Sequence, residues 1–237
     1  MKTWQADQLQ TLVSSESVAE VFASLAKLAR GLGFEYCAFG LRLPLPVTNP
    51  RMMAISNYPE AWQRRYREKA YLAIDPTVRH GITAVTPLIW SEQVFSEATE
   101  LWEDARSFGL VHGWMNPCHD GQGLRSMLTV ARSAEPLMED ELAQKLSRLE
   151  ALSQAAHVRI SQLVAPKLMP ELAVRLTERE SDALRWTADG KTSAEIGEIL
   201  GIAERTVVWH LNNAVARLGA SNKTAAAVRA SVLGLLN

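Results

Sequence analysis

The sequence of 237 residues predicts an α+β protein with two domains, an α/β/α sandwich followed by a C-terminal four-helix domain that contains a helix-turn-helix. Strand and helix patterns alternate through the first part of the chain, which is typical of helices packed on both faces of a sheet. Only helical patterns follow, and two of these helices are short and joined by a turn with an early glycine. A proline-containing stretch separates the two parts, so we expect domains at 1–164 and 176–237 and a linker at 165–175.

The composition is that of an ordinary globular protein, with 47% hydrophobic residues, 22% charged residues and a net charge of −1. No apolar run approaches the roughly 18 residues of a membrane span, and the N-terminus lacks the apolar core of a signal peptide. The two cysteines, Cys37 and Cys118, are too few for a disulfide scaffold. We therefore expect a cytoplasmic protein with no membrane partner.

The elements of the first domain follow from capping signals and periodicity. Ser17 and Glu20 have the spacing of a capping box, and apolar residues follow at helical spacing until Gly31. Asp75 before Pro76 predicts the N-cap of a later helix. The remaining predicted elements are strands at 34–43, 51–56, 111–118 and 124–132 and helices at 60–67, 97–108 and 139–163. The last helix is also a candidate dimer surface because of its length.

The C-terminal domain shows the pattern of a helix-turn-helix. Thr177-x-x-Glu180 is a capping box for a helix that runs to about residue 188, and the short helix SAEIGEIL begins at Thr192 or Ser193 and ends at Gly201. We expect the helix in RTVVWHLNNAVARL to lie in the major groove of DNA, and a last helix to follow at 221–236. The residues predicted to point outward are Arg205, Thr206, Val208, Trp209 and Asn212.

The sequence of these last 60 or so residues is similar to that of the DNA-binding domain of the LuxR family. The positions that carry this resemblance are Leu176, Thr177, Arg179, Glu180, Leu184, Gly190, Lys191, Glu195, Ile196, Leu200, Thr206, Val207, His210, Leu218 and Lys223. The resemblance implies that Thr206, Val208 and Asn212 face the bases. The residues that it implies to contact phosphates are Lys191, Thr192, Arg205 and Lys223.

The charge of this domain and one of its side chains limit how it can bind DNA. From residue 176 on, seven basic residues balance seven acidic ones, so DNA contact must come from local placement of charge and from helix ends. Val208 stands where members of the family often carry a polar or basic residue, and a valine can contact only a thymine methyl group. The operator sequence or affinity would then differ from the family's norm. Trp209 is expected to pack against the adjacent helix rather than to contact DNA.

Three aromatic residues of the first domain, Tyr58, Trp62 and Tyr66, follow one another at i, i+4 spacing and would share a helix face. A core stripe explains this spacing without a ligand. Polar-tipped aromatic residues, however, need partners for their O–H and N–H groups when they are buried. Together with Ala38 and Gly40 on a neighbouring strand, they would suit an apolar cavity with a few placed polar groups.

With these residues, the whole chain resembles the acyl-homoserine-lactone receptors of quorum sensing. The residues that carry this resemblance in the first domain are Gly33, Phe34, Glu35, Tyr36, Tyr58, Pro59, Trp62, Tyr66, Asp75, Pro76, Trp90, Trp102, Ala105, Arg106, Gly109 and Gly113. The resemblance implies that the Trp62 indole donates to the lactone carbonyl, that Tyr58 donates to the acyl amide carbonyl, and that Asp75 accepts the ligand amide N–H. A simple N-cap is the alternative role for Asp75.

The same resemblance implies further residues of the ligand site. The residues expected to line it without a polar contact are Tyr66, Trp90, Trp102, Leu110 and Met127. Thr129 and Ser56 are candidate donors to an oxygen at the 3-position of the acyl chain, while Ala38 stands where some members of the family carry a hydroxyl.

We therefore predict a homodimeric transcriptional regulator whose effector is an N-acyl-homoserine lactone and whose target is a palindromic site in double-stranded DNA. RNA polymerase would be a further partner of an activator. No catalytic site and no cofactor are expected. Cys118, His119 and His112 lack a matching pair of metal ligands elsewhere, so no metal is expected either.

Several alternatives remain open. The acidic pair, phospho-acceptor Asp and Lys of a phosphorylation receiver are not visible in the first domain. A regulator that binds DNA without a ligand, or one that senses a different apolar small molecule, would fit the same pattern. An enzyme that processes a lactone or an acyl amide would need a water-activating base, a role for which Asp75 is poorly suited.

Overall fold

The computed structural model describes residues 9–236, which form two compact units. The main division of the chain falls between Val164 and Ala165. Two short segments, Leu43–Arg51 and Asp120–Leu124, are grouped with the second unit. No helix among the described residues is both long and apolar enough to cross a membrane.

The first unit is built on a five-stranded antiparallel sheet with the strand order β2-β1-β5-β4-β3. The strands are β1 (Tyr36–Arg42), β2 (Met52–Ser56), β3 (Leu88–Ile89), β4 (His112–His119) and β5 (Arg125–Arg132). Six of the eight residues in each of β4 and β5 are buried, as expected of strands that are covered on both faces.

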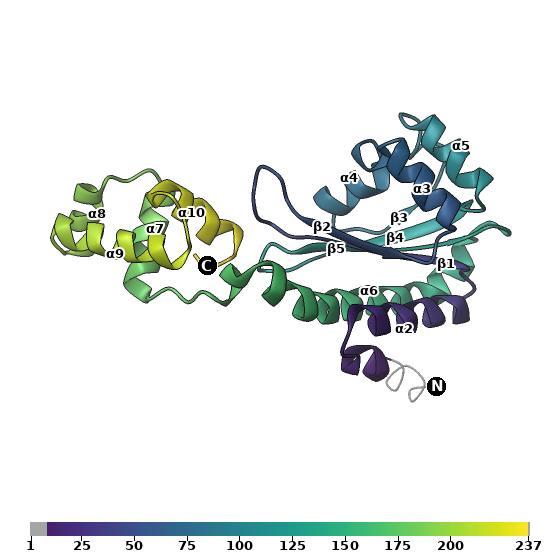
Figure 1. Ribbon diagram of the computed structural model, residues 1–237, viewed down its shortest axis with the longest axis horizontal. Helices are drawn as coiled ribbons and strands as arrows, with labels where there is room; N and C mark the ends of the chain where they lie inside the picture. The colour runs from purple at the N-terminus through teal and green to yellow at the C-terminus, as the bar shows by residue number, and fades with distance from the viewer. Residues whose placement is uncertain (1–8, 237) are drawn as a thin grey trace. The chain divides into compact units, whose positions relative to one another are not determined.

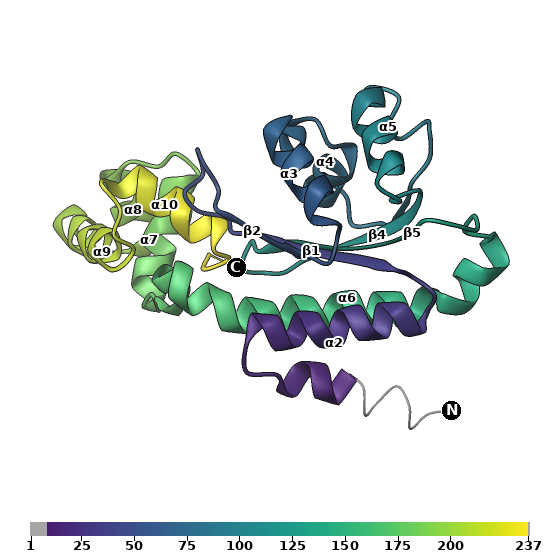
Figure 2. The same cartoon turned by 45° about the vertical axis from the view of Figure 1, so that its right-hand side comes forward.

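Helices cover both faces of this sheet (Figures 1 and 2). The helices on one face are α2 (Val18–Gly31) and α6 (Glu139–Leu168), and those on the other are α3 (Glu60–Glu68), α4 (Pro76–Thr83) and α5 (Thr99–Ser107). A helical segment at 9–14 precedes α2, and the 3-10 helix η1 (Tyr71–Ala73) follows α3. The predicted α/β/α sandwich is thereby confirmed.

The strand register decides which side chains lie under α3, α4 and α5. Ala38 pairs with Thr129 and Gly40 with Met127, so these four positions lie on one face of the sheet. On the opposite face, the Ser126 hydroxyl lies 2.8 Å from Nδ1 of His157, which joins β5 to α6. The face under α3, α4 and α5 therefore carries small side chains at its centre, as the sequence predicted.

Local details differ from the expected elements in two places. The Ser17 side chain accepts from the Glu20 N–H, but the Glu20 carboxylate accepts from the N–H of Glu16 rather than Ser17, so the predicted capping box is only half formed. The last helix of the sandwich continues through Pro166 to Leu168, because a proline in the final turn removes only one helical hydrogen bond. The expected linker therefore begins as helix.

The second unit contains four helices after the 3-10 helix η2 (Pro170–Ala173). They are α7 (Glu178–Ala188), α8 (Ser193–Leu200), α9 (Glu204–Arg217) and α10 (Lys223–Val232). The predicted capping box of Thr177 and Glu180 forms. Of the two predicted starts of the short helix, Thr192 is the N-cap, and it forms a second complete capping box with Glu195. Gly201 has the left-handed conformation, with φ of 67°, and ends α8.

The turn between α8 and α9 brings two backbone segments close together. A Cβ added at Gly197 would lie 2.8 Å from the carbonyl oxygen of Ile202, so only glycine fits this position without a shift of backbone. The buried side chains of Ile196, Val207 and Leu211 pack the two helices together. The predicted helix-turn-helix is confirmed.

Candidate ligand-binding and DNA-binding sites

An aromatic cluster fills the layer between the sheet and helices α3 and α5. Trp62, from α3, is 4% exposed and lies stacked on Tyr71, with the ring centroids 6.0 Å apart. Tyr66 meets both rings edge-on, at 5.6 Å from Trp62 and 5.9 Å from Tyr71. Tyr58 precedes the helix, so it does not share the helical face predicted for it, but it packs edge-on against Tyr36 of β1 at 6.1 Å.

The two carboxylate oxygens of Asp75 have different hydrogen-bond partners. Its Oδ1 accepts from the backbone N–H of Thr77 at 2.8 Å and from the Thr77 hydroxyl at 2.7 Å, which is the N-cap of α4. Its Oδ2 accepts from the Tyr66 hydroxyl at 2.8 Å. The cap explains only Oδ1. A carboxylate oxygen can accept more than one hydrogen bond, so Oδ2 could also accept from a ligand N–H.

The tyrosine hydroxyls near Asp75 stay protonated. Burial raises the pKa of Tyr58 well above its ordinary value, and Cys37 and Asp75 raise it further. Burial also raises the pKa of Tyr66, followed by the charge of Asp75 and the hydrogen bond to it. Both groups are therefore neutral donors at any pH near neutrality.

Trp90 and Trp102 each bury an indole N–H that has no hydrogen-bond partner among the described residues. The two rings meet edge-on with centroids 6.4 Å apart, and Phe95 stacks on Trp102 at 4.6 Å. A Cβ added at Gly113 would overlap the indole ring of Trp90, so this glycine makes room for the ring. Buried donors are costly when unpaired, which makes this layer suited to a ligand that carries acceptors.

The floor of this layer is the sheet face that carries Ala38, Gly40, Met127 and Thr129. Thr129 is buried, and Ala131, two residues further along β5, belongs to the aromatic cluster itself. The Met127 side chain lies between two glycines. A Cβ built on Gly40 would be 3.7 Å from Met127 Cγ, and one built on Gly81 of α4 would be 2.8 Å from Met127 Sδ.

The predicted ligand-binding residues therefore all lie on the side of the sheet covered by α3, α4 and α5. Those that belong to or pack against one buried cluster are Tyr58, Trp62, Tyr66, Trp90, Trp102 and Leu110. Asp75 joins them through Tyr66.

A supporting network around Tyr71 was not anticipated from the sequence. Asp104 of α5 accepts from the Tyr71 hydroxyl and from Nε of Arg65, both at 2.6 Å. Burial and the bond to Asp104 raise the pKa of Tyr71 to about 12. Because Tyr71 stacks on Trp62, this network fixes one wall of the cluster. The partners are 33 residues apart in the chain, and no local pattern connects them.

In the second unit, helix α9 presents the residues predicted to face DNA bases. Val207 and Leu211 are buried, while Arg205, Val208 and Asn212 are exposed. Thr206 is half-buried.

The residues predicted to contact phosphates lie on several elements. Lys223 is exposed at the first position of α10, and Lys191 lies 3.9 Å from Glu195. The Thr192 hydroxyl caps α8, since it accepts from the N–H of Glu195, and it donates to the Glu195 carboxylate at 2.9 Å. Thr192 therefore has a structural role that does not depend on DNA.

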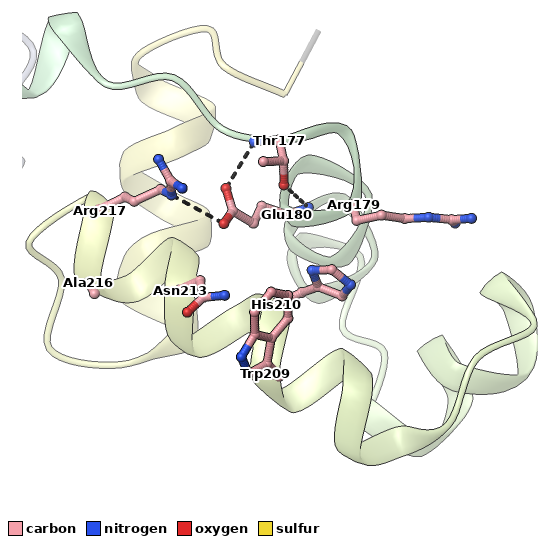
Figure 3. A pocket seen from close by; sticks show the side chains of 8 residues that line it. All are labelled: Thr177, Arg179, Glu180, Trp209, His210, Asn213, Ala216 and Arg217. Atoms are coloured by element: carbon pink, nitrogen blue, oxygen red, sulfur yellow. Dashed lines mark hydrogen bonds and ion pairs between the residues drawn. The ribbon is translucent and has the colours of Figure 1, made fainter.

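Trp209 does not pack as expected. Its side chain is 60% exposed, which contradicts the prediction that it packs against the adjacent helix. Trp209 instead forms one wall of a pocket of about 600 Å³ between α7 and α9 (Figure 3). The other residues that line this pocket are Thr177, Arg179, Glu180, His210, Asn213, Ala216 and Arg217.

The two cysteines are buried in the first unit. Burial raises the pKa of Cys37 to about 12 and that of Cys118 to about 11, which keeps both as unreactive thiols. Across residues 9–236, His, Cys, Asp and Glu form no group of three or more that could hold a metal ion.

Comparisons with known proteins match both units to families. The family described as "Autoinducer binding domain" matches residues 17–160. The family described as "Bacterial regulatory proteins, luxR family" matches residues 174–230.

Individual relatives cover the whole chain. The transcriptional activator protein AnoR of Acinetobacter nosocomialis is 43% identical over 238 residues, which is all of both chains. The crystal structure of Escherichia coli SdiA matches with a TM-score of 0.82 and 34% identity, over 99% of this chain and 98% of that one. SdiA in complex with octanoyl-rac-glycerol matches with a TM-score of 0.79 and 32% identity, over 99% and 96% of the two chains.

A third relative covers about two thirds of the chain. The structure of CepR2 from Burkholderia cenocepacia, described as an N-acylhomoserine lactone dependent LuxR family factor, has a TM-score of 0.62 and 32% identity. It covers 68% of this chain and 94% of its own.

Proposed function

Since the chain belongs to the LuxR family of bacterial regulators and carries an autoinducer-binding domain, we propose that its effector is an N-acyl-homoserine lactone. Residues 1–164 form the ligand-binding domain in this proposal, residues 165–175 the linker and residues 176–237 the DNA-binding domain. The CepR2 relative is lactone-dependent by its description, which supports this choice of ligand. Relatives of the chain are transcriptional regulators, and its role here is regulatory rather than catalytic.

The observation that carries the proposal is the carboxylate of Asp75, whose Oδ2 accepts from the Tyr66 hydroxyl and can accept one further hydrogen bond. A lactone headgroup has one amide N–H and two carbonyl groups to pair in a site without water. Asp75 Oδ2 accepts the amide N–H. Tyr58, which stays protonated, donates to the acyl carbonyl, and the Trp62 indole donates to the lactone carbonyl.

The acyl chain then lies along the small side chains of the sheet. Ala38, Gly40 and Met127 offer an apolar surface to it, and Thr129 supplies the one hydroxyl among these four floor positions. In this proposal Thr206, Val208 and Asn212 face the bases, and Lys191, Thr192, Arg205 and Lys223 contact the phosphates.

The regulatory mechanism is coupled stabilisation and dimerisation. A ligand that binds only the folded sandwich stabilises it by mass action. Two such chains form a homodimer, and their recognition helices meet a palindromic site about one DNA turn apart. Two half-sites acting together compensate for the near-neutral charge of each DNA-binding unit. RNA polymerase is a further partner if the protein activates transcription.

A second candidate ligand is a monoacylglycerol. The related SdiA structure with octanoyl-rac-glycerol motivates it, because that molecule also joins an acyl chain to a small polar head. Its hydroxyls can donate to Asp75, but it has no amide N–H.

The direct experiment measures the thermal midpoint of the full-length protein with lactones of increasing acyl length and with octanoyl-rac-glycerol. At a concentration of 100 Kd, the preferred lactone stabilises by about 2.7 kcal/mol, which raises the midpoint by roughly 5–10 °C. Asp75→Asn should abolish this rise without loss of the N-cap, since asparagine caps as well as aspartate. Trp62→Phe should weaken the response, and Trp186→Phe on α7 is the matched control that should leave it unchanged.

A midpoint that does not respond to any lactone would contradict the proposed ligand. A response to octanoyl-rac-glycerol alone would replace the lactone with the acylglycerol. A response that persists in Asp75→Asn would contradict the assigned headgroup contacts.

A further inference from the structure

Helix α9 exposes an aromatic side chain at the centre of its outer face. Val207, Leu211 and Leu218 are buried and mark the inner stripe of the helix. Trp209 lies two residues after Val207, about 200° around the helix at 3.6 residues per turn. It therefore faces directly away from the core of its unit, and its side chain is 60% exposed.

The packing of the unit does not need Trp209. The ring contact that the structure shows for it is with His210, the next residue of the same helix, at 4.9 Å. A pocket of about 600 Å³ lies between the indole and the residues of α7, including Arg179 and Glu180 (Figure 3). A tryptophan left open to water in this way has apolar surface available for a partner.

The neighbours of Trp209 give this face a defined pattern. Val208 beside it is 40% exposed, so two adjacent side chains form an apolar centre. Arg205 and Asn212, both exposed, lie one turn before and about one turn after it. Arg179 and Arg217 are exposed on the side of the pocket, and Arg217 also pairs with Glu180 at 3.2 Å. An apolar centre with cationic flanks complements a duplex, whose phosphates border the groove that the helix enters.

We propose that Trp209, together with Val208, contacts thymine methyl groups in the major groove and thereby selects T·A pairs near the centre of each half-site. The thymine methyl is the apolar group that the four base pairs display in this groove. The proposal rests on the DNA-binding function of the second unit, and it names thymine as the base that this chain recognises.

The test removes single methyl groups from the DNA. Full-length protein, with and without the lactone that raises its midpoint most, first enriches binding sites from random duplexes. Each enriched thymine is then replaced by deoxyuridine, which lacks only the methyl group. The wild type should lose affinity about three- to tenfold at one or two positions per half-site. This loss is smaller than the discrimination that a good bidentate base contact gives.

The same substitutions are repeated with two variants and a control. Trp209→Ala should bind the intact site about tenfold more weakly and lose most of the methyl effect at those positions, with only the share of Val208 left. Trp209→Phe should retain part of the methyl effect, because it keeps an aromatic ring. Trp186→Phe, on α7, should behave as the wild type. An unchanged thermal midpoint for Trp209→Ala, as expected for an exposed residue, shows that the variant folds.

The outcomes separate this inference from the function on which it rests. A methyl effect of wild-type size in Trp209→Ala would overturn the inference and leave DNA binding intact. Normal DNA binding by Trp209→Ala combined with loss of transcription would overturn it too and assign the side chain to a protein partner. Failure of the wild type to enrich any sequence, with or without lactone, would contradict DNA recognition and the inference together.

Discussion

At the scale of single residues, Met127 is the adaptable part of the proposed ligand site. It lies on the sheet face shared with Ala38 and Thr129, and it fills the space that Gly40 and Gly81 leave open. Methionine is unbranched and fits irregular gaps, so its position can change with the length of a neighbouring acyl chain. We infer that Met127 limits the length of chain that the site accepts.

Met127→Ala should therefore shift the preferred lactone to a longer acyl chain. The variant removes three heavy atoms, and added ligand methylenes that fill this space gain about 0.8 kcal/mol each. The measurement is the thermal midpoint of the variant across the same series of lactones. Without ligand, we expect the variant to be destabilised by about 2–3 kcal/mol.

Gly81→Ala provides the matched test, since the new Cβ would push the Met127 sulfur aside. It should shorten the preferred chain in the wild-type background and have a smaller effect when combined with Met127→Ala. Identical length preferences in the wild type and Met127→Ala would show that another residue sets the limit.

Glu180 is a buried carboxylate whose bonds connect two helices. It is 2% exposed and accepts from the N–H of Thr177 at 2.9 Å and from Nε of Arg217 at 3.2 Å. Glu180→Ala should destabilise the DNA-binding unit by about 2 kcal/mol, since a charged hydrogen bond and half of a capping box are lost. Hydrogen exchange of α7 and α9 amides measures the effect.

Glu178→Ala is the control for that prediction, because Glu178 is exposed in the same helical turn. A surface change of this kind should alter stability by less than about 0.5 kcal/mol. Equal amide exchange rates in the two variants would contradict the stabilising role assigned to Glu180.

At the scale of elements, an ion-pair network attaches the start of α6 to the end of β5. Arg132, whose side chain is 7% exposed, donates two hydrogen bonds to Glu141, at 2.8 and 2.7 Å, and Lys145 pairs with the same carboxylate. Hydrogen bonds from Arg132 and then Lys145 lower the pKa of Glu141 from 4.5 to about 2.

This lowered pKa gives the link a definite pH dependence. The stabilisation is fully present above pH 4.5, the unfolded value, and is lost as the pH falls toward 2, where the folded carboxylate takes up a proton. Glu141→Gln should therefore be less stable than the wild type at pH 7, by at most roughly 3 kcal/mol. The difference should shrink steadily between pH 4.5 and pH 2.

Unfolding curves of both proteins across this pH range measure the difference. Glu139→Gln, at the exposed start of the same helix, is the control and should show little pH-dependent difference. A difference between Glu141→Gln and the wild type that stays constant below pH 4.5 would contradict the account.

Elements with strong local signals could be predicted from the sequence. The Asp75-Pro76 cap, the Thr177 capping box, the start of α8 after Thr192 and the Gly201 stop all form as expected, because each depends on residues within one turn of helix. Strand β3 has only two residues and was not predicted, since so short a strand is defined by pairing with β4 and leaves no period to detect.

The parts of the site that escaped prediction depend on distant partners. Tyr71, Asp104 and Arg65 come together only in the folded chain. Phe95 stacks on Trp102 for the same reason. Trp209 points outward, as the helical phase of α9 predicted, but the further expectation that it packs against the adjacent helix is wrong, since it is 60% exposed.

The whole molecule joins a proposed ligand-binding unit and a DNA-binding unit in one chain. If lactone binding and DNA binding favour the same dimeric state, each ligand must increase affinity for the other by the same factor. Typical couplings of this kind are about 1–3 kcal/mol, or roughly 5- to 150-fold in affinity. The coupling free energy between lactone binding and DNA binding therefore measures the proposed regulation directly.

The most direct measurement is the dissociation constant of the full-length protein for its enriched DNA site, with and without saturating lactone. We predict that lactone lowers this constant at least about fivefold and that Asp75→Asn, still folded, shows no such effect. A soluble protein that binds the same DNA equally tightly with and without every lactone would contradict lactone-dependent regulation and identify a ligand-independent regulator.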